Sequence, residues 1–150
     1  MALDPPTPAR PDELDAICGL LTAQLAEHAI PLAPQLLAEA VRTALADDHK
    51  ALILLARQDG RPVGVAFVSF QSSLERGGRI MWLEELYVLP ELRGRGTGTA
   101  LLRAALDAAR IRGCRSVELE VETSHARAAN LYARAGFQPL ARVHWAMPLA

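Results

Sequence analysis

Apolar residues recur along this chain at two spacings, every three to four residues in some stretches and every second residue in others. The first spacing predicts helices over Glu13–His28, Pro34–Ala46, Thr97–Arg112 and Ser124–Arg134. The second spacing, together with short continuous apolar runs, predicts strands over Ala51–Arg57, Val63–Phe70, Ile80–Leu89 and Val117–Val121, with one or two more within Phe137–Met147. Residues 1–11 are expected to be either flexible or a first strand.

The connections between these segments predict a mixed sheet. Asp59-Gly60 is a tight-turn signal, so the two strands that it joins are expected to be antiparallel. The strands at Ile80 and Val117 are joined through a helix and are therefore expected to be parallel. A length of 150 residues matches one domain, and no repeat or linker divides it. The sequence thus predicts a single α/β domain over residues 1–150, with helices covering the sheet.

Composition narrows the classes of partner. The formal net charge is −1 and the arginines are scattered, so the chain lacks the basic surface of a nucleic-acid-binding protein. No apolar stretch is long enough to cross a bilayer, so no membrane partner is expected. Cys18 and Cys114 provide neither a disulfide framework nor the spacing of a metal site. The N-terminus also lacks the features of a signal peptide, so we expect a cytoplasmic protein. Because the cysteines lack metal-site spacing, we expect no bound metal.

The segment Arg93-Gly94-Arg95-Gly96-Thr97-Gly98 lies between a predicted strand and a predicted helix. This order directs free backbone N–H groups and the positive end of a helix dipole toward one place, which favours binding of a phosphate or pyrophosphate. The spacing is neither the G-x-G-x-x-G of dinucleotide-binding proteins nor a Walker A loop, which requires a lysine. The alternative is an ordinary surface turn with incidental arginines.

The remaining pattern, R-x-x-G-x-G at Arg93, Gly96 and Gly98, resembles the coenzyme A pyrophosphate loop of the GNAT N-acetyltransferase superfamily. A second stretch is similar to the other cofactor motif of that family, L-x-V-x-x-x-N-x-x-A-x-x-x-Y-x-x-x-G-F. Its matching residues are Leu119, Val121, Ala128 or Ala129, Tyr132, Gly136 and Phe137. His125 departs from this motif because it stands where the family usually has asparagine.

The resemblance implies an α/β, single-domain GNAT fold, with a mixed, mostly antiparallel central sheet of about six or seven strands flanked by about four helices. It also implies acetyl-CoA (coenzyme A) as co-substrate. The contacts that it implies for coenzyme A are Leu86, Tyr87, Val88, Arg93, Gly94, Arg95, Gly96, Thr97, Gly98, Thr99, His125 and Asn130. Within the superfamily, the stretch 82–88 resembles the L-E-D-x-x-V strand of the diamine (spermidine/spermine-type) acetyltransferases.

Acetyl transfer to an amine first requires removal of a proton from an ammonium group whose pKa is ~10. A carboxylate whose pKa is raised by desolvation can accept that proton. Glu84 and Glu85 lie on an otherwise apolar strand, an unfavourable place for two charges without a function. Because side chains alternate along a strand, only one of them can face the site unless a bulge intervenes. By resemblance, Glu84 is predicted to be the base and Glu85 is the second choice; the alternative is that both face solvent.

The resemblance also assigns the other two parts of the reaction. The backbone N–H groups of Leu86 and Val88, on a strand splayed from its neighbour, are expected to stabilise the oxyanion. Tyr132 is predicted to protonate the leaving thiolate, because a tyrosine pKa of ~10 lies close to the thiol pKa of ~8.5. The alternative for Tyr132 is a structural ring packed beside Phe137.

Together these observations predict an acetyl-CoA-dependent N-acetyltransferase that acts on a primary amine of a small molecule, by direct attack in a ternary complex. Two alternatives stay open, namely transfer to a protein or peptide amine, and a non-catalytic acyl-CoA-binding regulatory module. The resemblance further implies a homodimer, with the final strands around Val143–Met147 as its expected contact.

Overall fold

The computed structural model describes residues 2–149, and the chain forms two compact units, residues 1–120 and 121–150. Among the described residues, the first unit contains a five-stranded sheet and three α-helices, and the second contains one α-helix. In chain order the elements are β1 (Leu3–Pro8), α1 (Leu14–Glu27), α2 (Pro34–Ala46), β2 (Ala51–Gln58), β3 (Arg61–Ser73), β4 (Gly78–Val88), α3 (Thr97–Ile111), β5 (Val117–Leu119) and α4 (Ala126–Ala135), with 3₁₀ turns at Pro11–Glu13 and Pro90–Leu92.

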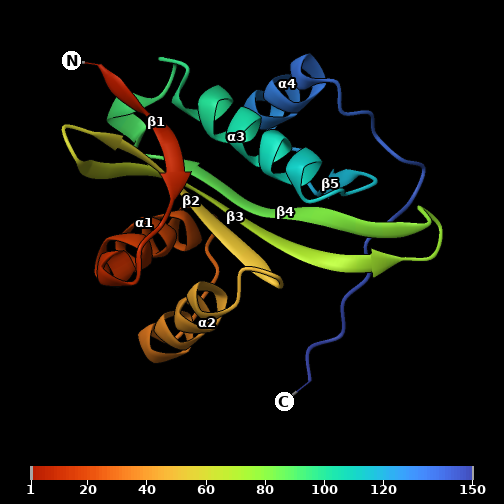
Figure 1. Ribbon diagram of the computed structural model, residues 1–150, viewed down its shortest axis with the longest axis horizontal. Helices are drawn as coiled ribbons and strands as arrows, with labels where there is room; N and C mark the ends of the chain where they lie inside the picture. Colours follow the sequence, from red (N-terminus) through yellow and green to blue (C-terminus); the bar gives the residue numbers. More distant parts are fainter. Residues whose placement is uncertain (1, 150) are drawn as a thin grey trace. The chain divides into compact units, whose positions relative to one another are not determined.

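The strands of the sheet follow the chain order from β1 to β5 (Figure 1). Strands β1 to β4 are successively antiparallel, and β5 lies parallel to β4. The predicted hairpin is confirmed, since β2 and β3 are joined at Asp59 and Gly60, which have positive φ angles of 53° and 77°. Two positive φ angles in succession produce a turn whose twist matches that of the flanking strands. The predicted parallel pair is confirmed too, with α3 as its crossover helix.

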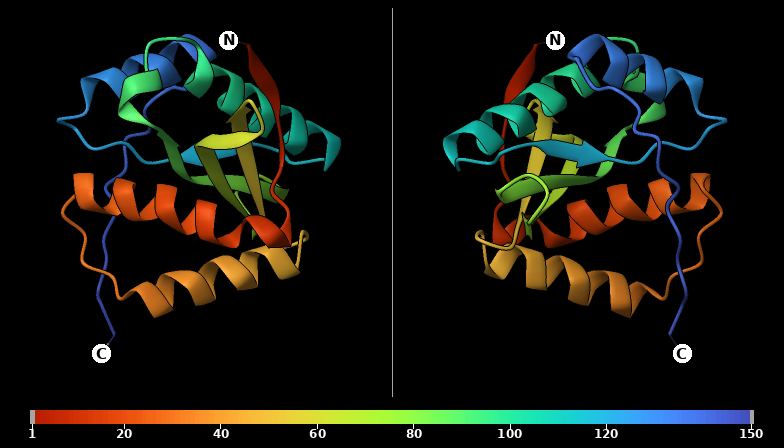
Figure 2. Two further views of the ribbon diagram at one scale, coloured as in Figure 1. Left: turned by 90° about the vertical axis from the view of Figure 1, so that its left-hand side faces the viewer. Right: turned by 90° about the vertical axis from the view of Figure 1, so that its right-hand side faces the viewer.

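Helices cover both faces of this sheet. Figures 1 and 2 show α1 and α2 side by side on one face and α3 on the other. Strand β2 is consequently buried from Ala51 to Arg57 without interruption. A strand covered on both faces is expected to be a continuous apolar run rather than an alternating one, as its sequence is.

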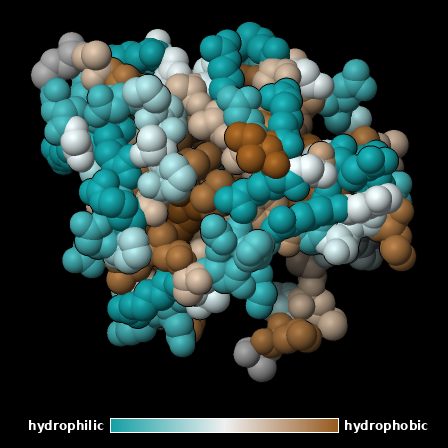
Figure 3. All heavy atoms as spheres, viewed as in Figure 1, coloured by the Kyte–Doolittle hydropathy of each residue, from teal (hydrophilic) through white to brown (hydrophobic). Residues whose placement is uncertain are grey.

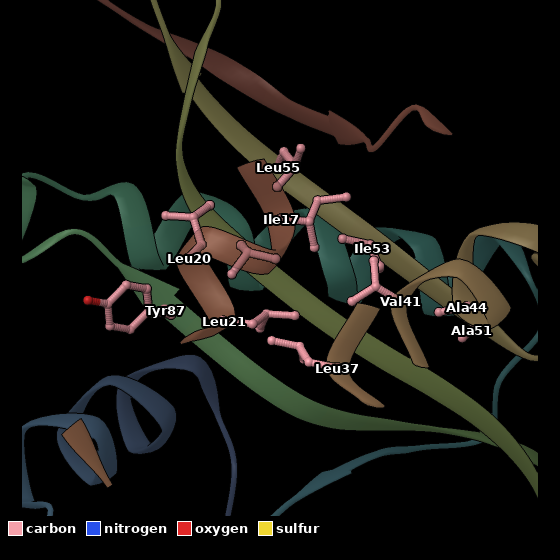
Figure 4. Packing of buried hydrophobic residues seen from close by; sticks show 11 residues of the cluster. Ile17, Leu20, Leu21, Leu37, Val41, Ala44, Ala51, Ile53, Leu55 and Tyr87 are labelled. Carbon is pink, nitrogen blue, oxygen red and sulfur yellow. The ribbon is translucent and has the colours of Figure 1, made fainter. Parts of the chain in front are cut away.

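One part of the core lies between the sheet and the helices α1 and α2. Figure 4 shows Ile17, Leu20 and Leu21 of α1 facing aliphatic side chains of α2 and β2, with the Tyr87 ring at one end of the cluster. These three residues have the three-to-four-residue spacing of one helix face. On the opposite face, Leu101 of α3 is fully buried. The core therefore fixes β4 between two helical layers.

A buried ion pair joins the start of α1 to the sheet. Arg57 of β2 donates from Nη2 to Glu13 Oε1 over 2.6 Å, from Nε to Glu13 Oε2 over 3.0 Å, and from Nη1 to Thr7 Oγ1 over 2.6 Å. Both charged side chains are less than a tenth exposed. Because the carboxylate and the guanidinium satisfy one another, neither is left as an unpaired buried charge.

The second unit contains α4 and an extended tail. His125 is the N-cap residue of α4, and Gly136 ends the helix in the left-handed conformation with φ 106°. The strands expected within Phe137–Met147 were predicted wrongly, because the described residues 137–149 contain no strand. Strand β5 is also shorter than predicted and ends at Leu119, so the described sheet has five strands instead of six or seven.

The physical reason is that an extended segment becomes a strand only when its backbone is paired. The tail does have apolar side chains at alternate positions, and they are largely exposed to solvent. Their exposed fractions are 80% for Val143, 88% for Trp145, 79% for Met147 and 82% for Leu149. In Figure 3 hydrophobic side chains are visible along this tail. The tail thus has the alternating pattern of a strand, but within the described residues it is not paired with a neighbouring strand.

Candidate active site

The glycine-rich segment forms the turn that leads into α3. Gly94 and Gly96 have φ angles of 75° and 87°, a conformation that residues with a Cβ atom rarely adopt. Gly96 is the N-cap residue of α3, and its carbonyl oxygen accepts the first helical hydrogen bond, from Ala100, at 2.9 Å. The amides of Thr97, Gly98 and Thr99 consequently have no acceptor within the helix. They produce the concentration of N–H groups that an anion prefers.

Gly64 holds the start of α3 close to the sheet. A Cβ atom at this position would lie 3.0 Å from Leu101 Cδ1, 3.2 Å from the Tyr87 carbonyl oxygen and 3.4 Å from Thr97 Cγ2. A side chain here would therefore push α3 away from β3 and β4. Our reading of the sequence missed Gly64, although a glycine in the middle of an apolar strand is a recognised signal of close backbone approach.

Arg93 ties the turn to its surroundings. Its Nε donates to the Val88 carbonyl oxygen over 2.9 Å, and its Nη2 contacts both carboxylate oxygens of Glu27, at the end of α1, at 2.9 and 3.0 Å. The guanidinium also lies over the Tyr87 ring, 5.3 Å from its centroid. Arg93 thus forms an ion pair with Glu27, whereas the Arg95 side chain is exposed beside the glycines.

Strand β4 leaves its parallel partner half-way along its length. The pairing of β4 with β5 covers Met81 to Leu83 on β4, whereas β4 itself continues to Val88. The Leu89 amide donates to the Val63 carbonyl oxygen at 3.0 Å, so that amide points toward β3. Because amide directions alternate along a strand, the amides of Leu86 and Val88 point toward the opposite edge, where the described pairing with β5 has ended. The strand was predicted to separate here from its neighbour.

A β-bulge in β4 determines where the two adjacent carboxylates point. Glu85 lies opposite Phe67 of β3 and Leu83 lies opposite Val68, so Glu84 is an extra residue without its own partner. A bulge interrupts the alternation of side chains. Glu84 lies close enough to Ser69, and Glu85 close enough to Gln24 of α1, for each neighbour to lower the pKa of the carboxyl group. Ser69 and Phe67 are two residues apart on β3, so both glutamates are on the sheet face that α1 covers.

Both carboxyl groups have raised pKa values. Burial raises the pKa of Glu84, and the nearby Ser69 opposes that shift. Burial also raises the pKa of Glu85; the nearby His28 and Gln24 lower it, while the Glu84 charge raises it further. Glu84 is more exposed than Glu85. Two neighbouring carboxyl groups with raised pKa values are typical of a site that accepts protons near neutral pH.

Three predicted site residues belong to the second unit. His125 precedes α4, and Asn130 and Tyr132 lie on it. The Tyr132 ring packs edge to face against Phe137, with ring centroids 5.9 Å apart and planes at 66°. This contact is the one expected if Tyr132 has a structural role. The roles predicted for His125, Asn130 and Tyr132 remain predictions.

The structure also bears on metals and membranes. Within residues 2–149, no three His, Cys, Asp or Glu side chains gather closely enough to hold a metal ion. None of the helices among these residues combines the length and the apolar character that crossing a bilayer requires.

The family model described as the acetyltransferase (GNAT) family matches residues 16–137. The chain belongs to this family. Membership confirms the resemblance seen at the glycine-rich loop and identifies the protein as an N-acetyltransferase.

Individual relatives agree with this membership. The protein is 33% identical over 101 residues to an uncharacterized N-acetyltransferase of Bacillus subtilis, YhfO, which covers 67% of this chain and 68% of that protein. It is 32% identical over 115 residues to an aminoglycoside N(6')-acetyltransferase of Stenotrophomonas maltophilia, which covers 74% and 75%. Other curated relatives match over smaller shares, down to 24% of their own length.

A solved structure shares the fold. The aminoglycoside N-acetyltransferase AAC(6')-Iy, in complex with CoA, superimposes with a TM-score of 0.84 at 21% identity, covering 99% of this chain and 96% of that one. The predicted fold class, a mixed α/β arrangement with a mostly antiparallel sheet and four helices, is thereby confirmed.

Proposed function

We propose that this acetyltransferase transfers an acetyl group from acetyl-CoA to a primary amine of a small molecule, by direct attack in a ternary complex. The observation that carries the proposal is the arrangement of β4. Along one strand the chain presents a carboxylate pair at Glu84 and Glu85, then outward amides at Leu86 and Val88, then the glycine turn. From Glu84 to Val88 the strand rises about 13 Å, at ~3.3 Å per residue.

The three parts match the demands of the reaction. Glu84 accepts the ammonium proton, for which its raised pKa is favourable. The nitrogen lone pair then attacks the thioester carbonyl carbon, and the Leu86 and Val88 amides donate to the oxygen on which negative charge develops. The amides of Thr97, Gly98 and Thr99 bind the pyrophosphate, with Arg95 beside them. Arg93 contributes by holding the turn against β4 and α1.

The remaining roles belong to the second unit. Tyr132 donates a proton to the leaving thiolate, and His125 and Asn130 contact the coenzyme A arm, with His125 replacing an amide donor by an imidazole donor. Support comes from the family motif in which these residues stand and from the match of the family model across both units, residues 16–137. On the same ground we propose that both units together form one GNAT domain, residues 1–150.

A small acceptor is favoured by the relatives. The S. maltophilia protein is an aminoglycoside acetyltransferase, and AAC(6')-Iy was also solved with a bisubstrate analogue that joins CoA to acetylneamine. The stretch 82–88 additionally suggests an acceptor of the diamine type. Two properties stay expectations, a cytoplasmic location and a homodimer formed through the apolar tail around Val143–Met147. Light scattering that gave the monomer mass at every concentration would exclude the homodimer.

Two measurements test the proposed reaction. Calorimetric titration with acetyl-CoA is expected to show saturable binding, and a flat trace from folded protein would contradict the proposal. Thiol release from acetyl-CoA is then followed with neamine, 1,4-diaminobutane and a lysine-containing peptide, and acceleration by either small amine supports it. Acceleration by the peptide alone would indicate a protein acetyltransferase, and binding without turnover on any amine would indicate the regulatory module.

A further inference from the structure

Gln24 is a polar residue in the apolar stripe of α1. It follows Ile17, Leu20 and Leu21 at helical spacing and is 7% exposed, so it faces the sheet with them. Its amide lies close enough to the Glu85 carboxylate to lower the pKa of that group. A carboxylate only accepts hydrogen bonds, so the Gln24 nitrogen Nε2 must be the atom that faces it.

With Nε2 directed toward Glu85, the amide oxygen of Gln24 needs a hydrogen-bond donor from another group. Oε1 is buried and has no hydrogen-bond partner in the described protein. A buried acceptor without a donor costs free energy, and such groups are rare in folded proteins. Oε1 and Nε2 are bonded to the same carbon of one planar amide, so a group that reached Oε1 would also lie close to the atom that faces Glu85.

The group that fits this place can be derived from its chemistry. The cluster offers acceptors from three side chains, namely the carboxylates of Glu84 and Glu85 and the free amide oxygen of Gln24. A primary ammonium group carries a positive charge and three N–H donors. A fully substituted ammonium carries the same charge but has no donor to give. The cluster therefore suits a group with both charge and N–H donors.

We propose that Gln24 is a positioning residue for the acceptor, and that its Oε1, together with the Glu84 and Glu85 carboxylates, receives the primary ammonium group before proton transfer. The proposal rests on the proposed acetyl transfer for its biological meaning, but the binding itself can be measured without any reaction. Glu84 then removes one of the three protons, while Gln24 and Glu85 keep the nitrogen in place.

Nuclear magnetic resonance tests the binding directly. In ¹⁵N-labelled protein, the side-chain amide signals of Gln24 are identified by their disappearance in the Gln24→Met variant. Methylammonium chloride is expected to shift these signals saturably, whereas tetramethylammonium chloride at equal ionic strength is not. No shift with methylammonium, or an equal shift with both salts, would overturn the proposal. Methanol is the third probe, and an equal saturable shift with it would show a general polar cavity instead of an ammonium site.

Kinetics then separate positioning from a structural role. With an amine that the wild-type protein acetylates, Gln24→Met is expected to raise KM about tenfold or more, since hydrogen bonds to charged groups are strong. The affinity for acetyl-CoA and the inhibition constant of the matching alcohol are expected to stay unchanged. The control is Gln35→Met, the same exchange at an exposed position of α2. Equal losses for amine, alcohol and acetyl-CoA would assign Gln24 to structure alone. A protein that binds methylammonium but never turns over acetyl-CoA would contradict the proposed reaction and leave this site standing.

Discussion

At the scale of single residues, Glu84 and Glu85 are chain neighbours with different surroundings. Glu84 is the extra residue of the bulge and contacts Ser69, whereas Glu85 is paired with Phe67 and lies nearer to α1, by Gln24 and His28. The more exposed of the two can exchange protons with solvent, which a general base must do in every cycle. This difference supports Glu84 as the base and Glu85 as a binding group.

The choice of base predicts a pH-dependent defect. Glu84→Gln is expected to lower kcat about 100-fold near neutral pH, where the amine is protonated. The defect should shrink as pH rises toward the amine pKa, because free amine then forms without a base. In the wild-type protein, kcat should fall as pH decreases through the raised pKa of Glu84, because the protonated acid cannot accept a proton. The measurement is kcat against pH for both proteins. A larger loss of kcat in Glu85→Gln would exchange the two roles.

The glycine turn predicts a defect in binding. Gly98→Trp is expected to weaken acetyl-CoA binding by about tenfold or more, because an indole side chain beside the first-turn amides of α3 obstructs the pyrophosphate. Calorimetry measures the dissociation constant. The control is Gly19→Trp at an exposed position of α1, where an added Cβ atom meets no atom within 4 Å. Unchanged affinity in Gly98→Trp would remove the turn from the binding site.

At the scale of elements, the buried ion pair anchors the start of α1 to β2. Arg57 makes contacts with both Glu13 and Thr7, so one side chain connects β1, β2 and the entry to α1. The pKa of Glu13 is lowered mainly by its hydrogen bond with Arg57, and burial opposes this effect. A depressed carboxyl pKa in the folded state stabilises the protein above the unfolded pKa, and this stabilisation is lost as pH falls through the folded value.

Removing the cation predicts a measurable loss of stability. Arg57→Met is expected to lower the free energy of unfolding at pH 7 by about 3 kcal/mol, because it removes the buried cation bound to Glu13 and leaves that carboxylate only the exposed Arg10 guanidinium, 3.7 Å away. The difference in the free energy of unfolding between variant and wild type should narrow in acid. Without Arg57, burial raises the pKa of Glu13, so the carboxyl group of the variant becomes protonated there and no longer carries a buried charge. Urea denaturation at pH 7 and pH 4 checks both statements. Lys50→Met is the control, since the Lys50–Asp47 pair is exposed and contributes little. A difference that stayed constant with pH would show that the charge is unimportant.

The elements also show what periodicity can predict. Helix α2 and the turn at Asp59-Gly60 were predicted correctly because their signals are local, namely helical spacing after Pro34 and a dipeptide that tolerates positive φ. The bulge at Glu84 could not be predicted, because it depends on the register between β3 and β4, and each strand alone reads as regular. The tail failed for the related reason that pairing needs a second strand, which no alternation of residues supplies.

At the scale of the whole molecule, the predicted site residues are divided between the two compact units. The carboxylates, the edge amides and the glycine turn belong to residues 1–120, whereas His125, Asn130 and Tyr132 belong to residues 121–150. The sequence motifs predicted both groups because each has local spacing. The contacts of Gln24 and Glu27 with the proposed site, by contrast, were not predicted, because they depend on what α1 faces.

This division predicts how the ligand acts on the chain. If acetyl-CoA contacts both units, its binding should slow amide hydrogen exchange at Thr97–Thr99 and also within residues 121–137. Mass spectrometry of the free and the saturated protein measures both segments at once. The Gly98→Trp variant is the control and should lose both effects together. Protection confined to Thr97–Thr99 would contradict the roles proposed for the second unit.

One consequence of the β4 bulge concerns sequence length. A chain lacking residue 84 would let β3 and β4 form an uninterrupted ladder, with every backbone group matched and nothing left over. Such a chain would keep its hydrophobic core and its glycine turn, yet one carboxylate would be gone and the alternation would be regular throughout. Among variants of this protein, a deletion of a single codon here should therefore yield a well-folded but inactive product, in which a more regular sheet has replaced the irregularity that the proposed chemistry requires.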